Sequence, residues 1–353
     1  MKVGIYDPYL DTLGGGERYC LTLAEWLMKK NWQVDIFWED ESIKKKIKER
    51  LNFNLEKVNF ISGKKSLLKR FFRERSYDLL FSFSDGSVPL MMGKKNILHF
   101  QIPFRNVGGR KWQSQIKMKR IDHAVCNSCF TKRFIDQEFG VNSRVIYPPV
   151  DIAQLKPKVK ENIILAVGRF SQLLQAKRQD ILIHEFKQMI KTNLNEYLRG
   201  WKLVLAGGTD VGGKEYFNKL KRGAGDYPIE FFENPSFSAL KGLYGRAKIF
   251  WSAAGFGIDE DKEPERVEHF GITTVEAMAA GCVPIVVGKG GPKEVVSAGK
   301  NGFFWDTIED LGQATIRLAS EKDLIERISQ SARESSRKFS EAMFRKKFDE
   351  IIG

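Results

Sequence analysis

The sequence predicts an α/β fold built from two doubly wound parallel sheets. Short apolar runs that suit strands alternate with runs of helical period along most of the chain. The alternation restarts after Pro148-Pro149, and each half contains a glycine-rich loop. A length of 353 residues is enough for two domains, each with its own core. Ligands bind beyond the carboxyl ends of parallel strands, so two such sheets facing each other would enclose a cleft.

The first half begins with a strand over 2–6, and a loop over 7–16 ends in three glycines before a helix-period run. Glycine leaves the backbone amides open to a ligand, so this loop predicts phosphate binding. A tight helix entry is the alternative. Further strands are expected at 33–38, 58–61, 78–83, 96–100, 123–127 and 144–147, with a helix over 128–140 before the last one.

The second half repeats the pattern after the two prolines, which end a strand and stiffen the chain. Strands are expected at 162–167, 201–206, 229–232, 249–253, 284–287 and 302–305, and helices at 177–191 and 341–352.

The chain is organised around residues 268–281, which read EHFGITTVEAMAAG. Eight helical steps of about 100° would put Glu268 and Glu276 on different faces of one helix. We therefore expect Glu268 in a loop, Gly271 where the backbone approaches a ligand, and Glu276 on the following helix. The free amides of that helix favour phosphate. The stretch predicts a site for a polyol beside a phosphate.

This stretch, followed by Gly290-Gly291-Pro292, resembles the signature of the retaining glycosyltransferases of family 4, which have the GT-B fold. GGGER, NSCFTKRFI, YPPVD, VGRF and GGPKEVV occur in the order of that family and extend the resemblance over nearly the whole chain. The resemblance implies two Rossmann-like domains: an acceptor-binding domain over 1–150 and a nucleotide-sugar-binding domain over 151–338. A helix over 339–353 would return to the first domain.

The activity implied is the transfer of a hexose from a nucleotide sugar to an acceptor hydroxyl, with no bound metal and no cofactor. EHFGI with GGPK is similar to mannosyltransferases that build lipid-linked oligosaccharides, which favours GDP-mannose over UDP-hexose. The acceptor would be a lipid-linked or polysaccharide glycan. Rival functions are another GT-B activity, such as a sugar phosphorylase or nucleotide-sugar epimerase, and a basic nucleic-acid-binding protein.

The resemblance also assigns site residues. It implies that Glu276 holds the ribose and that Glu268 lies beside the transferred sugar. The other residues expected at the donor are Gly15, Gly16, Phe270, Gly271, Ile272, Thr273, Gly290 and Gly291.

Two cations follow the first strand of the second half. Arg169 leaves the strand and Lys177 opens the next helix, so both could stabilise the charge of a departing diphosphate. The family has fewer than the seven residues found here between them, so Arg178 is an alternative to Lys177. His99 is expected to bind a sugar hydroxyl, with Gln101 as the alternative, and His269 to orient the loop.

A net charge of +14 calls for an anionic partner such as nucleotide, nucleic acid or lipid. Residues Lys64–Arg75 and Arg105–Arg120 mix cations with apolar side chains, as surfaces on an anionic membrane do, although a solvated surface is the alternative. The interleaved aromatic and basic pattern of a nucleic-acid reader is not evident, so no nucleic-acid partner is expected.

Three further features of the sequence bear on metal binding, redox chemistry and location. The acidic loop over 258–268 lacks regular ligand spacing, which favours a solvated loop over a divalent metal site. Cys126 and Cys129 lack a second pair to complete a zinc site and are interpreted as reduced thiols. The start does not suggest a signal peptide, and no apolar run is long enough for a membrane span. We expect a cytoplasmic protein, with the inner face of the membrane as a further location.

Overall fold

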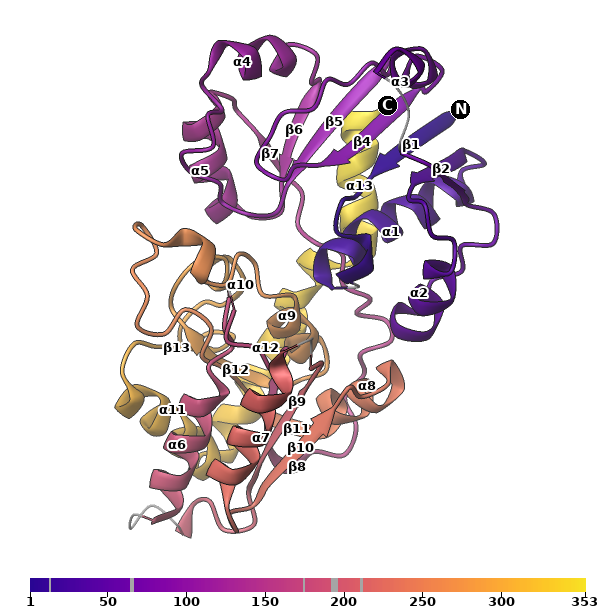
Figure 1. Cartoon of the computed structure of the whole chain (residues 1–353). Coiled ribbons are helices and arrows are strands. Elements are labelled where there is room, and N and C mark those ends of the chain that lie inside the picture. The colour runs from indigo at the N-terminus through magenta and orange to yellow at the C-terminus, as the bar shows by residue number, and fades with distance from the viewer. Residues whose placement is uncertain (13, 64–66, 174, 192–195, 210–211) are drawn as a thin grey trace. The chain divides into compact units, whose positions relative to one another are not determined.

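The computed structural model describes residues 1–12, 14–63, 67–173, 175–191, 196–209 and 212–353, without the side chains of residues 67 and 68. The chain forms two compact units (Figure 1). Unit 1 comprises Met1–Pro149 together with Glu341–Gly353, and unit 2 comprises Val150–Ser340.

Unit 1 contains a seven-stranded parallel sheet in the order β3-β2-β1-β4-β5-β6-β7. Its strands are β1 (Lys2–Tyr6), β2 (Gln33–Phe37), β3 (Asn59–Ile61), β4 (Leu79–Phe83), β5 (Lys95–Phe100), β6 (His123–Cys126) and β7 (Arg144–Val145). Its helices are η1 (Leu10–Thr12), α1 (Gly15–Lys29), α2 (Ile43–Leu51), α3 (Leu67–Glu74), α4 (Trp112–Met118), α5 (Cys129–Phe139) and α13 (Glu341–Ile352). The strand order reverses between β1 and β4, and open parallel sheets generally bind ligands at the carboxyl ends of the strands at such a reversal.

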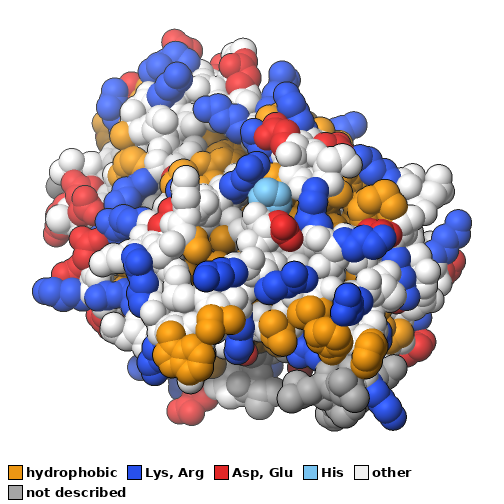
Figure 2. Space-filling model, turned by 90° about the horizontal axis from the view of Figure 1, so that it is seen from above, with side chains coloured by type: hydrophobic (Ala, Val, Ile, Leu, Met, Phe, Trp, Pro, Cys, Tyr) orange, Lys and Arg blue, Asp and Glu red, His pale blue; other side chains and the backbone are white. Residues whose placement is uncertain are grey.

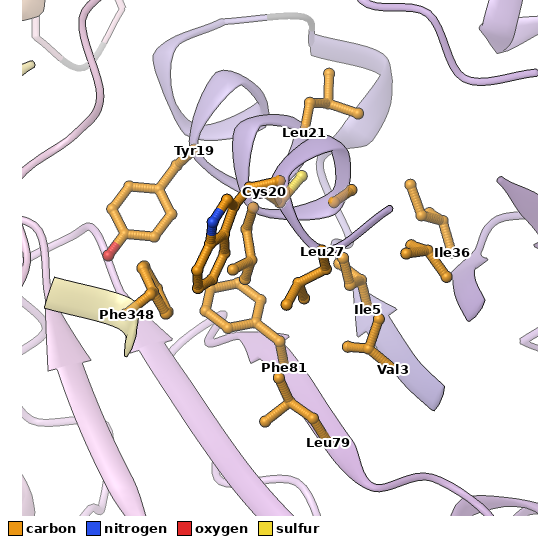
Figure 3. Close-up of a cluster of buried hydrophobic side chains, with 14 of the residues drawn as sticks. Val3, Ile5, Tyr19, Cys20, Leu21, Leu27, Ile36, Leu79, Phe81 and Phe348 are labelled. Carbon is orange, nitrogen blue, oxygen red and sulfur yellow. The ribbon is translucent and has the colours of Figure 1, made fainter. Parts of the chain in front are cut away.

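The core of unit 1 joins the two ends of the chain. Val3, Ile5 and Phe81 from the sheet pack against α1, and Phe348 of α13 lies in the same cluster (Figure 3). The ring of Tyr19 lies 5.9 Å from that of Phe348. Lys95 donates hydrogen bonds to the last carbonyls of α13, those of Ile351 at 3.1 Å and Ile352 at 2.7 Å. Helix α13 is therefore an integral part of unit 1.

Unit 2 contains a six-stranded parallel sheet in the order β10-β9-β8-β11-β12-β13. Its strands are β8 (Glu161–Val167), β9 (Lys202–Gly207), β10 (Ile229–Glu233), β11 (Ala247–Ser252), β12 (Val283–Val287) and β13 (Phe303–Trp305). Its helices are α6 (Gln179–Lys191), α7 (Gly213–Ala224), α8 (Phe237–Arg246), η3 (Pro264–Arg266), α9 (Ile272–Ala279), α10 (Pro292–Val295), α11 (Ile308–Ser320), α12 (Lys322–Ser336) and η4 (Arg337–Phe339). Here the order reverses between β8 and β11.

The predicted fold class is confirmed, since both halves are doubly wound parallel α/β units. The expected strands all occur, with ends that move by at most two residues. One helix start was wrong: α6 begins at Gln179 and not at Lys177, because Arg178 has a φ of 47°, outside the helical region. Within the described ranges, no helix is both long and apolar enough to cross a membrane.

Candidate active site at the switch point of unit 2

The switch point of unit 2 lies where β8 and β11 end. The loop after β8, the loop before α9 and the start of α9 border a narrow cavity there. Its lining includes Val167, Lys177, Gln179, Ser252, Glu268 and Thr273. Three of these residues, Lys177, Glu268 and Thr273, were predicted for the site from the sequence, and they lie together at one edge of the sheet.

Lys177 and Glu268 form a partly buried ion pair in this cavity. Nζ of Lys177 lies 2.5 Å from Oε2 of Glu268, and the side chains are 21% and 16% exposed. Burial alone would raise the pKa of the Glu268 carboxyl. The charge and hydrogen bond of Lys177, with the charges of His269 and Arg169, instead hold that pKa below its ordinary value. Glu268 is therefore an ionised carboxylate at neutral pH.

In the loop after β8, Lys177 contacts Glu268 and Arg178 does not. Arg178 turns to Asp180, with Nη2 3.0 Å from Oδ2, so the alternative that it replaces Lys177 is not supported. The stem of Lys177 crosses Gly168, where an added Cβ would lie 2.6 Å from Cγ of the lysine. Arg169 is exposed at the end of β8, and its carbonyl accepts a hydrogen bond from Gln179 at 3.0 Å.

Gln175 is a contact residue that the sequence did not reveal. Its Nε2 lies 2.7 Å from Nδ1 of His269, one position from the ion pair of Lys177 with Glu268. The two contacts join the loop after β8 to the loop before α9. Ninety-four residues separate Gln175 and His269, and no motif links them. His269 is buried, as a role in orienting the loop requires.

Glu276 lies on α9, as predicted, and is 5% exposed. The hydroxyl of Tyr244 on α8 donates a hydrogen bond to its Oε2 at 2.8 Å, which fixes the orientation of the carboxylate. The helix follows Gly271, whose φ of 99° favours glycine, and Ile272 and Thr273 form its first turn. Tyr244 had no sequence signal, because buried tyrosines are common in helices that cover a sheet.

Phe270 has a packing role. Its ring is 3% exposed and meets the ring of Phe339 edge-on at 5.3 Å. The side chain anchors the loop between Glu268 and α9 to the core of unit 2. Any contact of Phe270 with a donor would therefore involve its backbone.

Gly290 and Gly291 pack against the Glu268 loop. A side chain on Gly290 would overlap the carbonyl oxygen of Glu268, and one on Gly291 would overlap that of His269. The amide of Gly291 donates to the carbonyl of Glu268 at 2.8 Å, and the amide of Gly290 donates to Oε2 of Glu260 at 2.6 Å. To bind a donor, the amides of Gly290 and Gly291 would each have to exchange the present hydrogen bond for one to the donor. Their contact with the donor stays a prediction.

The acidic loop before α9 is engaged in ion pairs. Glu260 also pairs with Lys293, Asp259 with Lys262 at 3.2 Å, and Glu263 with Arg266 at 2.5 Å. Among the residues that the structure describes, no group of three or more histidine, cysteine, aspartate or glutamate side chains is arranged to hold a metal ion.

In the glycine-rich loop of unit 1, the backbone amide of Gly14 already has a hydrogen-bond acceptor within the loop and the start of α1. Oε2 of Glu17 accepts a hydrogen bond from the amide of Gly14 at 2.5 Å. Asp7 is also buried, and burial with the charge of Glu17 raises its pKa to about 7. A site that already holds two carboxyl groups disfavours a phosphate, so the geometry does not support the phosphate prediction for this loop. Gly15 and Gly16 form the first turn of α1, and their contact with the donor stays a prediction.

His99 does not reach a surface. Its ring is fully buried and stacks on Tyr19 at 4.0 Å, and Phe83 packs edge-on at 4.9 Å. Burial lowers the pKa of His99 to about 3, so the ring is neutral. Gln101, the alternative, is partly exposed, and its amide covers Gly16 so closely that a side chain there would overlap it. Of the two, the geometry favours Gln101 as a ligand contact.

The two basic segments of unit 1 differ. In α3, Arg70 pairs with buried Glu74 at 2.5 Å and Arg73 lies over the ring of Phe37, so these cations turn inward, although Phe72 is exposed. Residues 64–66 of the segment lie outside the described residues. In α4, Trp112 and Ile116 are 69% and 55% exposed and share a face four residues apart. Figure 2 shows one face of the molecule, with lysine and arginine side chains among apolar ones.

Two doubly wound parallel units, with Lys177 and Glu268 paired at the switch point of the second, are the architecture of the GT-B class of enzymes. The chain belongs to the family Glycosyl transferases group 1, which matches residues 149–335, and Glycosyltransferase Family 4 matches residues 13–154. The family prediction is thereby confirmed.

Characterised relatives match part of the chain. GDP-Man:Man(3)GlcNAc(2)-PP-Dol alpha-1,2-mannosyltransferase of Dictyostelium discoideum is 28% identical over 233 residues, covering 61% of this chain and 43% of that protein. The human protein of the same name is 28% identical over 249 residues, covering 63% and 46%. The chain thus spans less than half the length of these relatives.

Solved structures share the fold. Anabaena HepE in complex with UDP and glucose has a TM-score of 0.75 and 17% identity, covering 100% of this chain and 99% of that one. A glycosyltransferase from Rickettsia africae has a TM-score of 0.77 and 18% identity, covering 99% and 97%. At these identities the likeness establishes the fold alone.

Proposed function

We propose that this protein is a retaining glycosyltransferase that moves a hexose, most favourably mannose from GDP-mannose, onto a hydroxyl of a lipid-linked or polysaccharide glycan. The observation that carries the proposal is the ion pair of Lys177 with Glu268 at the switch-point cavity, with a second buried carboxylate, Glu276, on the helix that follows the same loop. A cation suits a diphosphate, and two carboxylates suit the hydroxyls of a ribose and a hexose. The names of the mannosyltransferase relatives support mannose and a lipid-linked acceptor.

In the proposed mechanism unit 2 binds the nucleotide sugar and unit 1 the acceptor. Glu276, oriented by Tyr244, holds the ribose, and Glu268 holds a hydroxyl of the transferred sugar. Arg169 and Lys177 stabilise the diphosphate as its bond to the sugar breaks. The departing diphosphate takes the proton of the acceptor hydroxyl on the same face of the sugar. We propose that these cations meet the developing charge without a bound metal.

We place the protein in the cytoplasm, at the inner face of the membrane. The exposed Trp112 and Ile116 of α4 support this location, because they offer apolar anchors beside cations that attract anionic lipid. An acceptor carried by a lipid would be presented at such a surface.

The test is the thermal stability of the protein with GDP, UDP, ADP and their sugar conjugates, without added metal. A ligand that binds the folded state raises the melting temperature. We expect one nucleotide class to do so. In Glu276→Ala that shift should nearly disappear, and in Tyr244→Phe it should shrink, since a lost hydrogen bond to a charged group costs about 2 kcal/mol. Tyr197→Phe, at an exposed position of unit 2, is the matched control.

Transfer itself is tested by incubating the protein with the donor that binds and a lipid-linked glycan. Transfer of the sugar with retained anomeric configuration is the expected result. Binding that is unchanged in Glu276→Ala would refute the site, and donor turnover that requires inorganic phosphate would point to a phosphorylase instead.

A further inference from the structure

Lys177 and Glu268 are each other's counter-ion in this structure, although the proposed reaction assigns them to different parts of the donor. The ammonium and the carboxylate are 2.5 Å apart, and both side chains are mostly buried. The diphosphate needs the ammonium, and the sugar needs the carboxylate.

Two further contacts lie beside the pair. Gln175 contacts His269 at 2.7 Å, beside the pair, and Gln179 binds the carbonyl of Arg169 at 3.0 Å. The stem of Lys177 lies on Gly168, which has no side chain to block it. We therefore expect the ammonium to leave the carboxylate by rotation of the Lys177 side chain.

We propose that Glu268 acts as an internal substitute for the donor diphosphate. Without donor, its carboxylate neutralises Lys177. When the donor binds, the diphosphate takes over Lys177, and the carboxylate of Glu268 becomes available to a sugar hydroxyl. This inference rests on the proposed function, and it adds a link between two parts of the site.

The link has a physical reason and a consequence. A mostly buried ammonium without a counter-ion is strongly destabilising, so the site needs an anion in the absence of donor. Because the pair must separate, part of the binding energy of the diphosphate is spent on releasing Glu268. The sugar contact of Glu268 therefore forms only when a diphosphate is present.

The first test is the affinity of GDP and UDP, measured by titration calorimetry. Glu268→Gln keeps the shape of the side chain but removes its charge, so Lys177 is free for the diphosphate. We expect this variant to bind the diphosphate about tenfold more tightly, as is typical of coupled sites. Its sugar transfer should nevertheless be slower. Unchanged or weaker binding of the diphosphate would overturn the proposal.

Glu161→Gln is the matched control. It makes the same change in charge at the other end of β8, where Glu161 pairs with Arg246. Its affinity for both diphosphates should equal that of the wild type.

A double-mutant cycle separates exchange from simple repulsion between Glu268 and the diphosphate. In Lys177→Met the ammonium is absent, so a further Glu268→Gln change should leave the affinity nearly unchanged. If Glu268→Gln strengthens binding equally in both backgrounds, repulsion explains the effect and the exchange is wrong. A wild type that binds no nucleoside diphosphate would instead refute the proposed function itself.

Discussion

Asp7 is a buried carboxyl group at the end of β1, and it predicts how the stability of unit 1 depends on pH. Its pKa of about 7 exceeds the ordinary value of 3.8, because burial and the charge of Glu17 disfavour ionisation. The folded state therefore binds one more proton than the unfolded state between these values. The stability that Asp7 contributes is complete below about pH 4 and is lost as pH rises through 7.

The asparagine side chain in Asp7→Asn does not titrate, so this variant lacks the pH dependence that Asp7 contributes. We expect its free energy of unfolding to rise relative to the wild type by about 2 kcal/mol between pH 5 and pH 8. Urea denaturation at the two pH values measures the difference. Glu56→Gln, at an exposed position of unit 1 whose charge is not among those that raise the pKa of Asp7, should follow the wild type. Equal pH dependence in Asp7→Asn and wild type would contradict the prediction.

Some residues of the candidate site could be predicted from the sequence, and others could not. Glu268, Lys177 and Glu276 could be predicted as site residues because a local string and a strand end locate them, and the structure pairs Lys177 with Glu268. Tyr244 and Gln175 were missed because their contacts cross 32 and 94 residues, and no local pattern encodes such distances. His99 was expected at a ligand from family resemblance and a predicted strand end, but its side chain lies in the core, because both faces of a parallel sheet are buried.

At the scale of elements, α4 and α3 show what composition cannot distinguish. Both were expected to be basic membrane surfaces, yet two arginines of α3 fold back on Glu74 and Phe37, while α4 exposes Trp112 and Ile116. Composition gives the residues of a helix but not the direction of each side chain. The late start of α6 was also missed, because the positive φ of Arg178 leaves no signal in the sequence.

The prediction for α4 concerns vesicle binding. Trp112→Ser combined with Ile116→Ser should weaken partitioning onto vesicles with anionic lipid by about tenfold, because two apolar anchors are lost. Sedimentation with vesicles measures it. Val159→Ser, which removes an apolar side chain that is 88% exposed in unit 2, should have no effect. Equal binding by the double variant and the wild type would exclude α4 as the anchor.

At the scale of the whole molecule, unit 1 is assembled from two separate parts of the chain. The two doubly wound halves were predictable, because in each half strand-like apolar runs alternate with runs of helical period along the sequence. The return of the last helix to unit 1 came from family resemblance alone. The α13 pattern predicts a helix, but its contacts with Tyr19 and Lys95 span most of the chain.

Phe348→Ala tests this assembly. Removing a fully buried phenylalanine costs about 3 to 5 kcal/mol, and the loss should appear in unit 1. Hydrogen exchange should show reduced protection of β1, β4 and α1, with unit 2 unchanged. Phe250→Ala, in the core of unit 2, should give the opposite pattern. Loss of protection in unit 2 from Phe348→Ala would contradict this division.

The discontinuity of unit 1 also affects its biosynthesis. The 191 residues from 150 to 340 are translated between the two parts of unit 1. At about 5–20 residues per second, a ribosome needs roughly 10 to 40 seconds for them. During that time Tyr19 and Phe81 lack the cover of α13, whereas unit 2 is continuous and can fold as it emerges. The half of the chain that is made first is therefore expected to be completed last.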